Sequence, residues 1–207
     1  MTARVALATR NAHKVVEVRR ILDEVHLDID LVGLDAFPDV PDVAETGLTF
    51  EANALLKARA VAAATDLPAI ADDSGLAVDV LGGMPGIFSA RWAGRHGDDL
   101  ANLDLLLAQL TDVADPNRGA AFVCAAAFVT PTGQEEVVRG ELRGNLTRGP
   151  RGSNGFGYDP IFVPDGESRT TAEMSAREKD AISHRGLAFL SLADRISAVA
   201  FGNASAE

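Results

Sequence analysis

The sequence Ile-Ala-Asp-Asp-Ser-Gly at residues 70–75 decides the first hypothesis, because two adjacent carboxylates end a short apolar run. The run predicts a strand that meets a tight turn. Side chains alternate on an extended backbone, so Asp72 and Asp73 should face opposite ways. One is then free to hold a divalent cation, while the other orients water or a neighbouring group. The alternative is an Asp-Ser-Gly turn, in which these short polar side chains bond the local backbone.

The composition favours one soluble globular domain over residues 1–207, with 47% hydrophobic and 24% charged residues. The net charge of -11 argues against a nucleic-acid partner, since it repels a phosphate backbone. A small anionic substrate would need a local cluster of lysines, a cation or helix N-termini. We expect no membrane span and a cytoplasmic location, because the N-terminus is too brief for a signal peptide. The single cysteine, Cys124, lies in an apolar run and should be buried.

Strand and helix patterns alternate along the chain, which predicts an α/β layered fold with a mixed sheet. Hairpin and crossover connections both occur, and neither repeats nor a linker are visible. The expected strands lie at residues 5–8, 27–34, 69–81 (interrupted at 72–75), 119–130, 134–143 and 158–163. The expected helices lie at residues 14–25, 49–65, 98–110 and 183–199, with loops at 37–47, 82–86 and 149–157.

The segment Thr9-Arg10-Asn11-Ala12-His13-Lys14 lies between the first strand and the first helix. Backbone N–H groups and the helix dipole favour a phosphate there, and Lys14 adds a positive charge. The spacing is not that of a Walker A loop. An ordinary helix cap with a solvated lysine is the alternative.

Glu45 precedes the Ala-rich helix, and Asn53 and Lys57 are four residues apart on it, so they share a face. In the functional interpretation, Glu45 is a second metal carboxylate and Lys57 contacts phosphate. Mg²⁺ fits such a set, because it takes oxygen ligands from one or two carboxylates and from substrate phosphates. A solvated helix face is the alternative.

Two further segments could contact a nucleotide base. The glycine-flanked aromatics in Phe-Gly-Tyr-Asp at 156–159 could present a ring for stacking. Ser-His-Arg-Gly at 183–186, together with Lys179, offers hydrogen-bond donors that suit a base edge. Taken singly, the first could be a hydrophobic anchor under a glycine turn and the second a charged helix start.

Six blocks, taken in order, resemble the Ham1/RdgB family of non-canonical purine nucleoside triphosphate pyrophosphatases, also called inosine triphosphatases or dITP/XTP pyrophosphatases. The resemblance covers nearly the whole chain and is highly specific. The blocks are Glu-Thr-Gly-Leu-Thr-Phe at 45–50, Asn-Ala-Leu-Leu-Lys-Ala at 53–58, Ala-Asp-Asp-Ser-Gly-Leu-Ala-Val-Asp at 71–79, Pro-Gly-Ile-Phe-Ser-Ala-Arg at 85–91, Gly-Phe-Gly-Tyr-Asp-Pro-Ile-Phe at 155–162 and Glu-Lys-Asp-Ala-Ile-Ser-His-Arg-Gly at 178–186.

The resemblance implies an elongated mixed β-sheet flanked by helices, with two lobes and a substrate cleft between them. It implies Mg²⁺-dependent hydrolysis of ITP, dITP and XTP to the monophosphate and pyrophosphate by a homodimer, which removes deaminated purines. Asp73 would be the proton acceptor for water, and Glu45, Asp72 and Asp73 would form the metal site. The implied substrate contacts near the phosphates are Thr9, Arg10, Asn11, Ala12, His13, Lys14 and Lys57. Ser74 would also touch the substrate, and the implied contacts around the base are Phe156, Gly157, Tyr158, Asp159, Lys179, His184 and Arg185, with Phe156 stacking.

The first motif departs from the family pattern, which usually reads Thr-Gly-Asn, a small residue and Lys. This chain has Arg10 and His13 at the two bulkier positions. Arg10 could add charge toward phosphate or simply face solvent. Two rival functions stay open: a pyrophosphatase for modified pyrimidines or standard nucleotides, and a nucleotide sensor without turnover.

Overall fold

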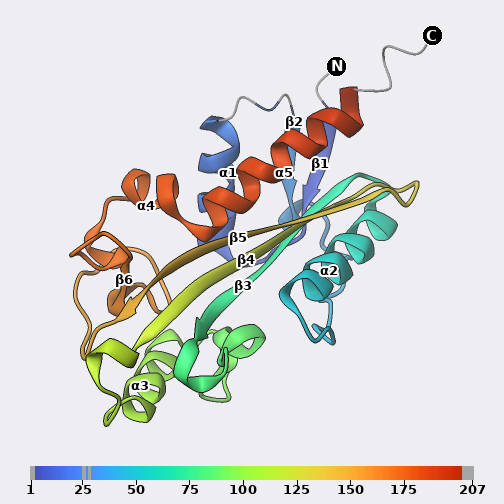
Figure 1. Ribbon diagram of the computed structural model, residues 1–207. Helices are drawn as coiled ribbons and strands as arrows, with labels where there is room; N and C mark the ends of the chain where they lie inside the picture. The colour runs from blue at the N-terminus through green and yellow to red at the C-terminus, as the bar shows by residue number, and fades with distance from the viewer. Residues whose placement is uncertain (1–2, 25–26, 28, 202–207) are drawn as a thin grey trace. The chain divides into compact units, whose positions relative to one another are not determined.

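The structure is a computed structural model that describes residues 3–24, 27 and 29–201, with side chains to residue 197. A six-stranded sheet has the order β2-β1-β3-β4-β5-β6 (Figure 1). β1 is parallel to β2 and β3, whereas β5 is antiparallel to β6, so the predicted mixed sheet is confirmed. The strands are β1 (Ala3–Leu7), β2 (Ile29–Gly33), β3 (Ala69–Val78), β4 (Gly119–Val129), β5 (Glu135–Leu146) and β6 (Phe162–Pro164).

Five α-helices lie in the described residues and flank the strands, as predicted for an α/β fold. They are α1 (Ala12–Glu24), α2 (Phe50–Thr65), α3 (Asp99–Gln109), α4 (Ala176–Ile182) and α5 (His184–Phe201). The side chains of Thr49 and Asp98 accept hydrogen bonds from backbone N–H groups three residues on, so each caps its helix where the sequence predicts a start. Val25, which the sequence places on the apolar face of the first helix, lies outside the described residues.

The chain divides into two compact units. The first unit comprises Met1–Asp73, Cys124–Gly140 and Arg185–Glu207, and the second comprises Ser74–Val123 and Glu141–His184. The single domain over residues 1–207 and the substrate cleft between two lobes stay predictions.

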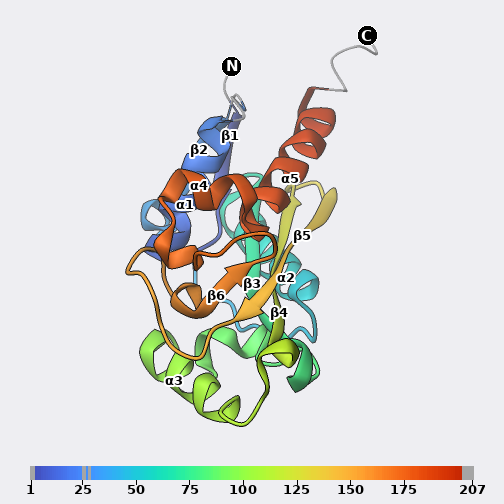
Figure 2. The same cartoon turned by 60° about the vertical axis from the view of Figure 1, so that its left-hand side comes forward.

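In the first unit, α1 and α5 cover one face of the strands and α2 lies on the other (Figures 1 and 2). The hydrophobic core on the α1/α5 face joins Val18 and Ile21 of α1 to Phe189 and Leu192 of α5. Ile70 of β3 and Cys124 of β4 point into the same core. The prediction of a buried strand around Cys124 is confirmed, and burial raises the pKa of its thiol.

In the second unit, α3 packs its leucines against the ends of β3, β4 and β5. Arg118 immediately precedes β4 and is only 2% exposed. Its guanidinium donates to the backbone carbonyls of Leu110 (2.7 Å), Leu146 (2.9 Å) and Thr147 (2.9 Å). These contacts satisfy a buried cation and tie the end of α3 to the end of β5. The sequence pattern predicts no such role for a single arginine.

The predicted interruption of the third strand at residues 72–75 is wrong, because β3 is continuous from Ala69 to Val78. Gly75 is a strand glycine that permits close approach. A Cβ there would overlap the carbonyl oxygen of Gly86 and the side chain of Ser89, which belong to a 3-10 helix at Gly86–Arg91. The Ser89 hydroxyl accepts a hydrogen bond from the Leu76 backbone N–H at 2.9 Å.

Two further corrections concern the C-terminal third. The predicted strand at 158–163 begins only at Phe162, since Asp159–Ile161 form a 3-10 turn with Pro160 near its start. The expected helix at 183–199 is preceded by α4, which is not among the helices predicted from the sequence. Its signal is the capping box formed by Ser175 and Glu178, which bond each other's backbone N–H groups.

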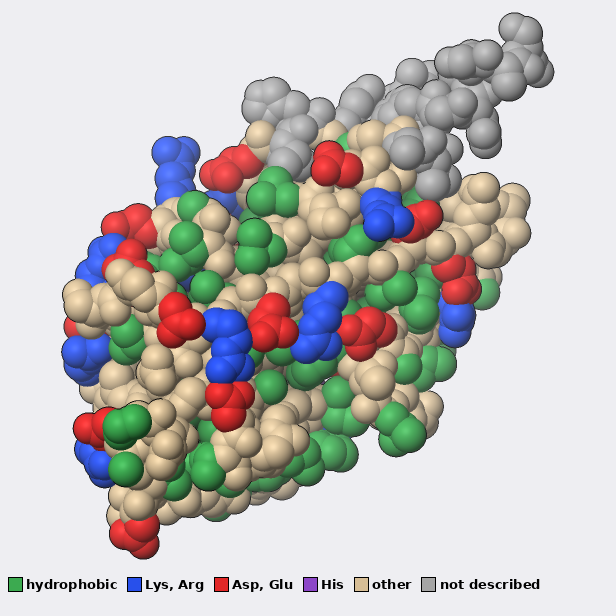
Figure 3. Space-filling view, viewed as in Figure 1, with side chains coloured by type: hydrophobic (Ala, Val, Ile, Leu, Met, Phe, Trp, Pro, Cys, Tyr) green, Lys and Arg blue, Asp and Glu red, His purple; other side chains and the backbone are tan. Residues whose placement is uncertain are grey.

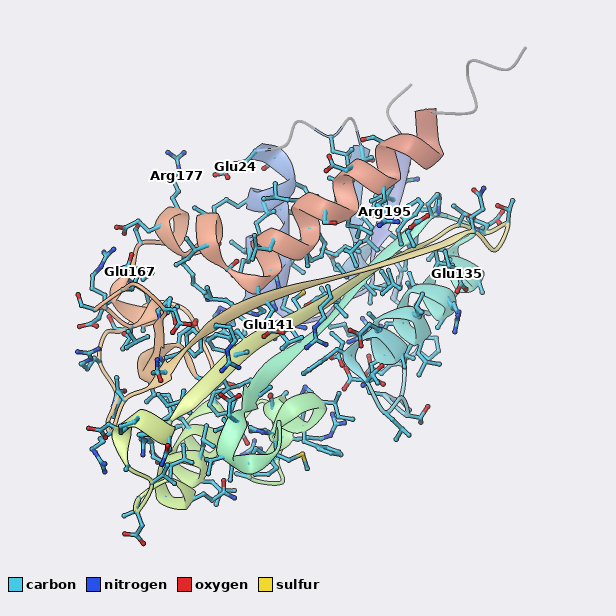
Figure 4. All side chains as sticks on the ribbon, in the orientation of Figure 1. Glu24, Glu135, Glu141, Glu167, Arg177 and Arg195 are labelled. Atoms are coloured by element: carbon cyan, nitrogen blue, oxygen red, sulfur yellow. The ribbon has the colours of Figure 1, made fainter. Side chains whose placement is uncertain are left out.

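Charged side chains of both signs are interspersed on the face in Figure 3. In the first unit, Arg59 of α2 makes two 2.6 Å hydrogen bonds to Glu135 at the start of β5, which is labelled in Figure 4. An ion pair as exposed as this one contributes little to the free energy of unfolding. Among the described residues, no helix is long and apolar enough to cross a bilayer.

Candidate active site

Asp72 and Asp73 project to opposite faces of β3, as the sequence predicts. Ile70, two residues before Asp72, faces the core beneath α1 and α5, and Asp72 follows it on that side. Asp73 faces α2 instead, where its carboxylate contacts two side chains of that helix. Continuity of the strand through both residues makes this division possible.

Asp72 is fully buried in an ion-pair network of the first unit. Its Oδ2 accepts hydrogen bonds from Lys14 Nζ at 2.9 Å and from the Arg185 guanidinium at 3.3 Å. Burial alone would raise the pKa of Asp72, but the charges of Lys14 and Arg185 hold it well below its usual range. Asp72 therefore stays ionised and fixes two cations near β3.

Arg185 also donates to Glu17, which lies one helical turn after Lys14 on α1. Glu17 is not among the site residues predicted from the sequence, although a glutamate between apolar positions on the inward face of a helix is a signal for such a residue. Burial alone would lower the pKa of Arg185, but Glu17 and Asp72 raise it. The structure thus brings Arg185 together with Asp72, Lys14 and Glu17.

Asp73 lies beside a lysine that also contacts Glu45. Lys57 Nζ is 2.9 Å from Glu45 Oε1 and 3.3 Å from Asp73 Oδ1. Burial alone would lower the pKa of Lys57, but the carboxylates of Asp73, Asp72 and Glu45 raise it. Burial raises the pKa of the Asp73 carboxyl, against the effect of Lys57. A buried carboxylate with a raised pKa is the usual form of a general base.

Asn53 connects Asp73 to the loop that carries Glu45. Its Nδ2 donates to Asp73 Oδ2 at 3.1 Å, and its Oδ1 accepts the Gly47 backbone N–H at 2.8 Å. A Cβ on Gly47 would overlap Asn53, so the glycine allows this approach. The predicted shared face of Asn53 and Lys57 is confirmed, since both reach Asp73.

No group of three or more His, Cys, Asp or Glu side chains among the described residues is arranged to hold a metal ion by itself. Glu45 and Asp73 nevertheless share one cationic neighbour, the Lys57 ammonium. A cation is thus already favoured between two carboxylate oxygens. This donor set fits a hard divalent cation that takes its remaining ligands from water and phosphate oxygens. Asp72, the third predicted ligand, faces the other side of β3.

The segment 9–14 forms a helix cap. Asn11 Oδ1 accepts the backbone N–H groups of His13 (3.0 Å) and Lys14 (3.2 Å), and Thr9 Oγ1 accepts that of Asn11 (3.2 Å). Ala12 begins α1. The Arg10 guanidinium contacts Asp42 at 2.8 Å and the Val40 carbonyl, so it bonds the 37–47 loop. The Lys14 side chain reaches the carboxylate pair from this segment, through its contact with Asp72.

The second unit gathers three of the residues expected near a base. Asp159 Oδ2 accepts the Phe156 backbone N–H at 2.9 Å and Lys179 Nζ at 2.7 Å. The Lys179 ammonium also lies 5.2 Å from the centroid of the Phe156 ring. A Cβ on Gly155, which has a φ of 74°, would overlap Asp159. The glycine before Phe156 is therefore required by both space and backbone angle.

The other predicted contacts in the second unit are placed differently. Tyr158 is buried in the core, and its hydroxyl donates to the Ser89 carbonyl at 2.9 Å, which favours the anchor interpretation. Gly157 donates its backbone N–H to Asp99 Oδ2 at 2.9 Å. The buried His184 ring stacks on Phe122, with centroids 4.9 Å apart. Ser74 is half-buried on β3 directly after Asp73.

Buried carboxylates on a central strand with lysines against them are groups that α/β enzymes acting on anionic substrates use. The Ham1 family profile matches residues 5–195, and the chain belongs to this family. A dITP/XTP pyrophosphatase of Streptomyces avermitilis is 67% identical over 189 residues, covering 91% of this chain and 94% of the relative. One from Mycobacterium tuberculosis strain H37Rv is 53% identical and covers 98% and 99%.

Solved structures give the same result. The chain is similar to a nucleoside-triphosphatase, dITP/XTP pyrophosphatase, from Mycobacterium abscessus, at 55% identity and a TM-score of 0.76, with 91% and 97% of the chains covered. It is also similar to a HAM1 protein from Coxiella burnetii, at 40% identity and a TM-score of 0.85, with 94% and 98% covered. The predicted family is confirmed.

Proposed function

We propose that this protein hydrolyses ITP, dITP and XTP to the nucleoside monophosphate and pyrophosphate, and so removes deaminated purines from the nucleotide pool. The observation that carries the proposal is the buried Asp73, held between Lys57 and Asn53 beside Glu45. The high identity to relatives named dITP/XTP pyrophosphatase supports the substrate class.

Mg²⁺ is the proposed metal, held by Glu45 and Asp73, with Asp72 supporting the site from the opposite face of β3. When bound, the ion would neutralise triphosphate charge and polarise the bond to be cut. Lys57, which pairs with both carboxylates in this structure, would contact phosphate. Lys14, the backbone around Asn11, and Ser74 would contact the remaining phosphate oxygens.

Asp73 is proposed to take the proton from the attacking water. Its raised pKa brings the carboxyl closer to the range in which a general base works. Asn53 donates to one carboxylate oxygen and would keep the other directed at water. Positioning and electrostatic stabilisation then supply the remaining rate enhancement, as is usual for transfer at phosphorus.

The base is proposed to stack on Phe156, within the segment 156–159. Lys179, His184 and Arg185 would donate to its edge. Lysine carries three donors and arginine five, so both can add a base contact to their ion pairs with Asp159 and Asp72. Donors aimed at the 6-oxo group would select hypoxanthine and xanthine over adenine, because adenine would leave buried donors unpaired.

The proposal also includes three general properties of the protein: a single domain, a homodimer, and a cytoplasmic location. Relatives of this length match nearly end to end, which supports one domain. The proposed binding partner is a small-molecule nucleotide, and we propose neither a nucleic acid nor a membrane as a partner.

The proposed reaction predicts pyrophosphate as the first product and an absolute need for a divalent cation. Purified protein is incubated with ITP and Mg²⁺, and pyrophosphate and orthophosphate are measured separately. We expect equimolar monophosphate and pyrophosphate, loss of at least 100-fold in rate after chelation with EDTA, and recovery on adding excess Mg²⁺. Orthophosphate as the first product, or an undiminished rate in EDTA, would contradict the proposal.

A further inference from the structure

Thr171 contacts Asp159, the residue that bonds the proposed base contacts of the second unit. It begins a 3-10 helix at Thr171–Glu173 and is 1% exposed. Its hydroxyl lies 2.8 Å from Asp159 Oδ1 and 3.1 Å from the Asp159 backbone carbonyl oxygen. A buried hydroxyl therefore engages the side chain and the backbone of the same aspartate.

Asp159 joins the two groups proposed to contact the base. Its Oδ2 accepts both the Phe156 backbone N–H and the Lys179 ammonium. Lys179 and Asp159 are nearly inaccessible, with 10% and 3% of their side chains exposed, so their pairing is little screened by solvent. The orientation of one carboxylate thus determines where the stacking ring and the ammonium lie.

Thr171 fixes that orientation from the other oxygen. Rotation of the carboxylate would break the bond to Oδ1 together with both bonds to Oδ2. Hydrogen bonds to a buried charge are stronger than neutral ones and costly to leave unmade. The overlap that a Cβ on Gly155 would have with this carboxylate indicates how closely the surroundings fit one position.

We infer that Thr171 is a positioning residue for base recognition: by holding Asp159, it sets the geometry of Phe156 and Lys179. This inference rests on the proposed function, because it assigns the base contacts to those two residues. It adds a specificity-determining hydroxyl that would touch no substrate. If the hydroxyl served stability alone, its removal would lower the unfolding temperature without weakening IMP binding more than pyrophosphate binding.

The test is calorimetric binding of IMP, and of pyrophosphate with Mg²⁺, to wild-type protein and to Thr171→Val. The substitution keeps the side-chain shape and removes the hydroxyl. We expect the valine variant to bind IMP about tenfold more weakly, with pyrophosphate affinity within about twofold of wild type. The ratio of kcat/KM for ITP to that for ATP should fall by the same factor. Thr171→Ser, which keeps the hydroxyl, should restore IMP binding to within about threefold.

Thr147→Val is the matched control, because the Thr147 hydroxyl also donates to a backbone carbonyl of the second unit, that of Gly149, at 2.8 Å. It should lower the unfolding temperature and leave the ratio of the two affinities unchanged. Should the Thr171 valine variant be unfolded by circular dichroism, the smaller Thr171→Ala carries the same prediction. Wild-type IMP affinity in the Thr171 variants, or equal losses for both ligands, would overturn the inference. Failure of the wild type to release pyrophosphate from ITP would instead overturn the proposed function.

Discussion

Asp73→Asn is expected to lower kcat for ITP by about 10³-fold, because an amide cannot accept the proton of the attacking water. The substitution keeps the side-chain size and the packing against α2. Binding should change much less than turnover. We expect the Kd of ITP to stay within about fivefold of wild type, measured with Ca²⁺ in place of Mg²⁺ so that ITP is not consumed during the measurement.

Asp79→Asn is the control for this prediction, since Asp79 directly follows β3 but pairs with the exposed Arg143. Its kcat should equal that of wild type. Near-normal kcat in Asp73→Asn, with normal ITP binding, would remove Asp73 from the role of proton acceptor.

Lys57→Met is expected to have the second-largest effect. It should raise the affinity for Mg²⁺ and lower kcat/KM for ITP. It removes the ammonium between Glu45 and Asp73, so the partly buried Glu45 and the buried Asp73 lose their cation. We expect the variant to bind Mg²⁺ more tightly in the absence of nucleotide, because the ion no longer competes with a lysine. Its kcat/KM for ITP should fall about 100-fold, since a phosphate contact is lost.

The measurement is Mg²⁺ titration by calorimetry beside steady-state kinetics. Arg59→Met, on the same helix, removes an exposed cation that pairs with Glu135 and should change neither quantity (Figure 4). Weaker Mg²⁺ binding in Lys57→Met would contradict the assignment of Glu45 and Asp73 as the metal pair.

The sequence predicts the parts of this protein that depend on local periodicity. Apolar runs, residue composition and turn residues place β1, α2, α3 and the β4–β5 hairpin close to their observed bounds, because each of these signals is local in the sequence. The opposite orientation of Asp72 and Asp73 also follows from local geometry, since adjacent side chains of a strand alternate.

Features set by distant neighbours could not be predicted in this way. Gly75 resembles a turn residue, yet its requirement comes from Gly86 and Ser89, which approach β3 from another element. Glu17 has a role only because α5 brings Arg185 to it, 168 residues along the chain. Tyr158 resembles a ligand-facing aromatic beside glycines, but tertiary packing buries it. Such contacts depend on which elements meet, and spacing in one sequence carries no record of that.

The most direct test of the proposed function is substrate selectivity. We would measure kcat/KM for pyrophosphate release from ITP, dITP, XTP, ATP, dGTP and dCTP with Mg²⁺. We expect kcat/KM for the three deaminated purines to exceed that for the other nucleotides by about 100-fold or more, because buried donors reject a base that leaves them unpaired. Equal values for ATP or dCTP would contradict it and favour a pyrophosphatase of another specificity, while binding without pyrophosphate release would favour a nucleotide sensor.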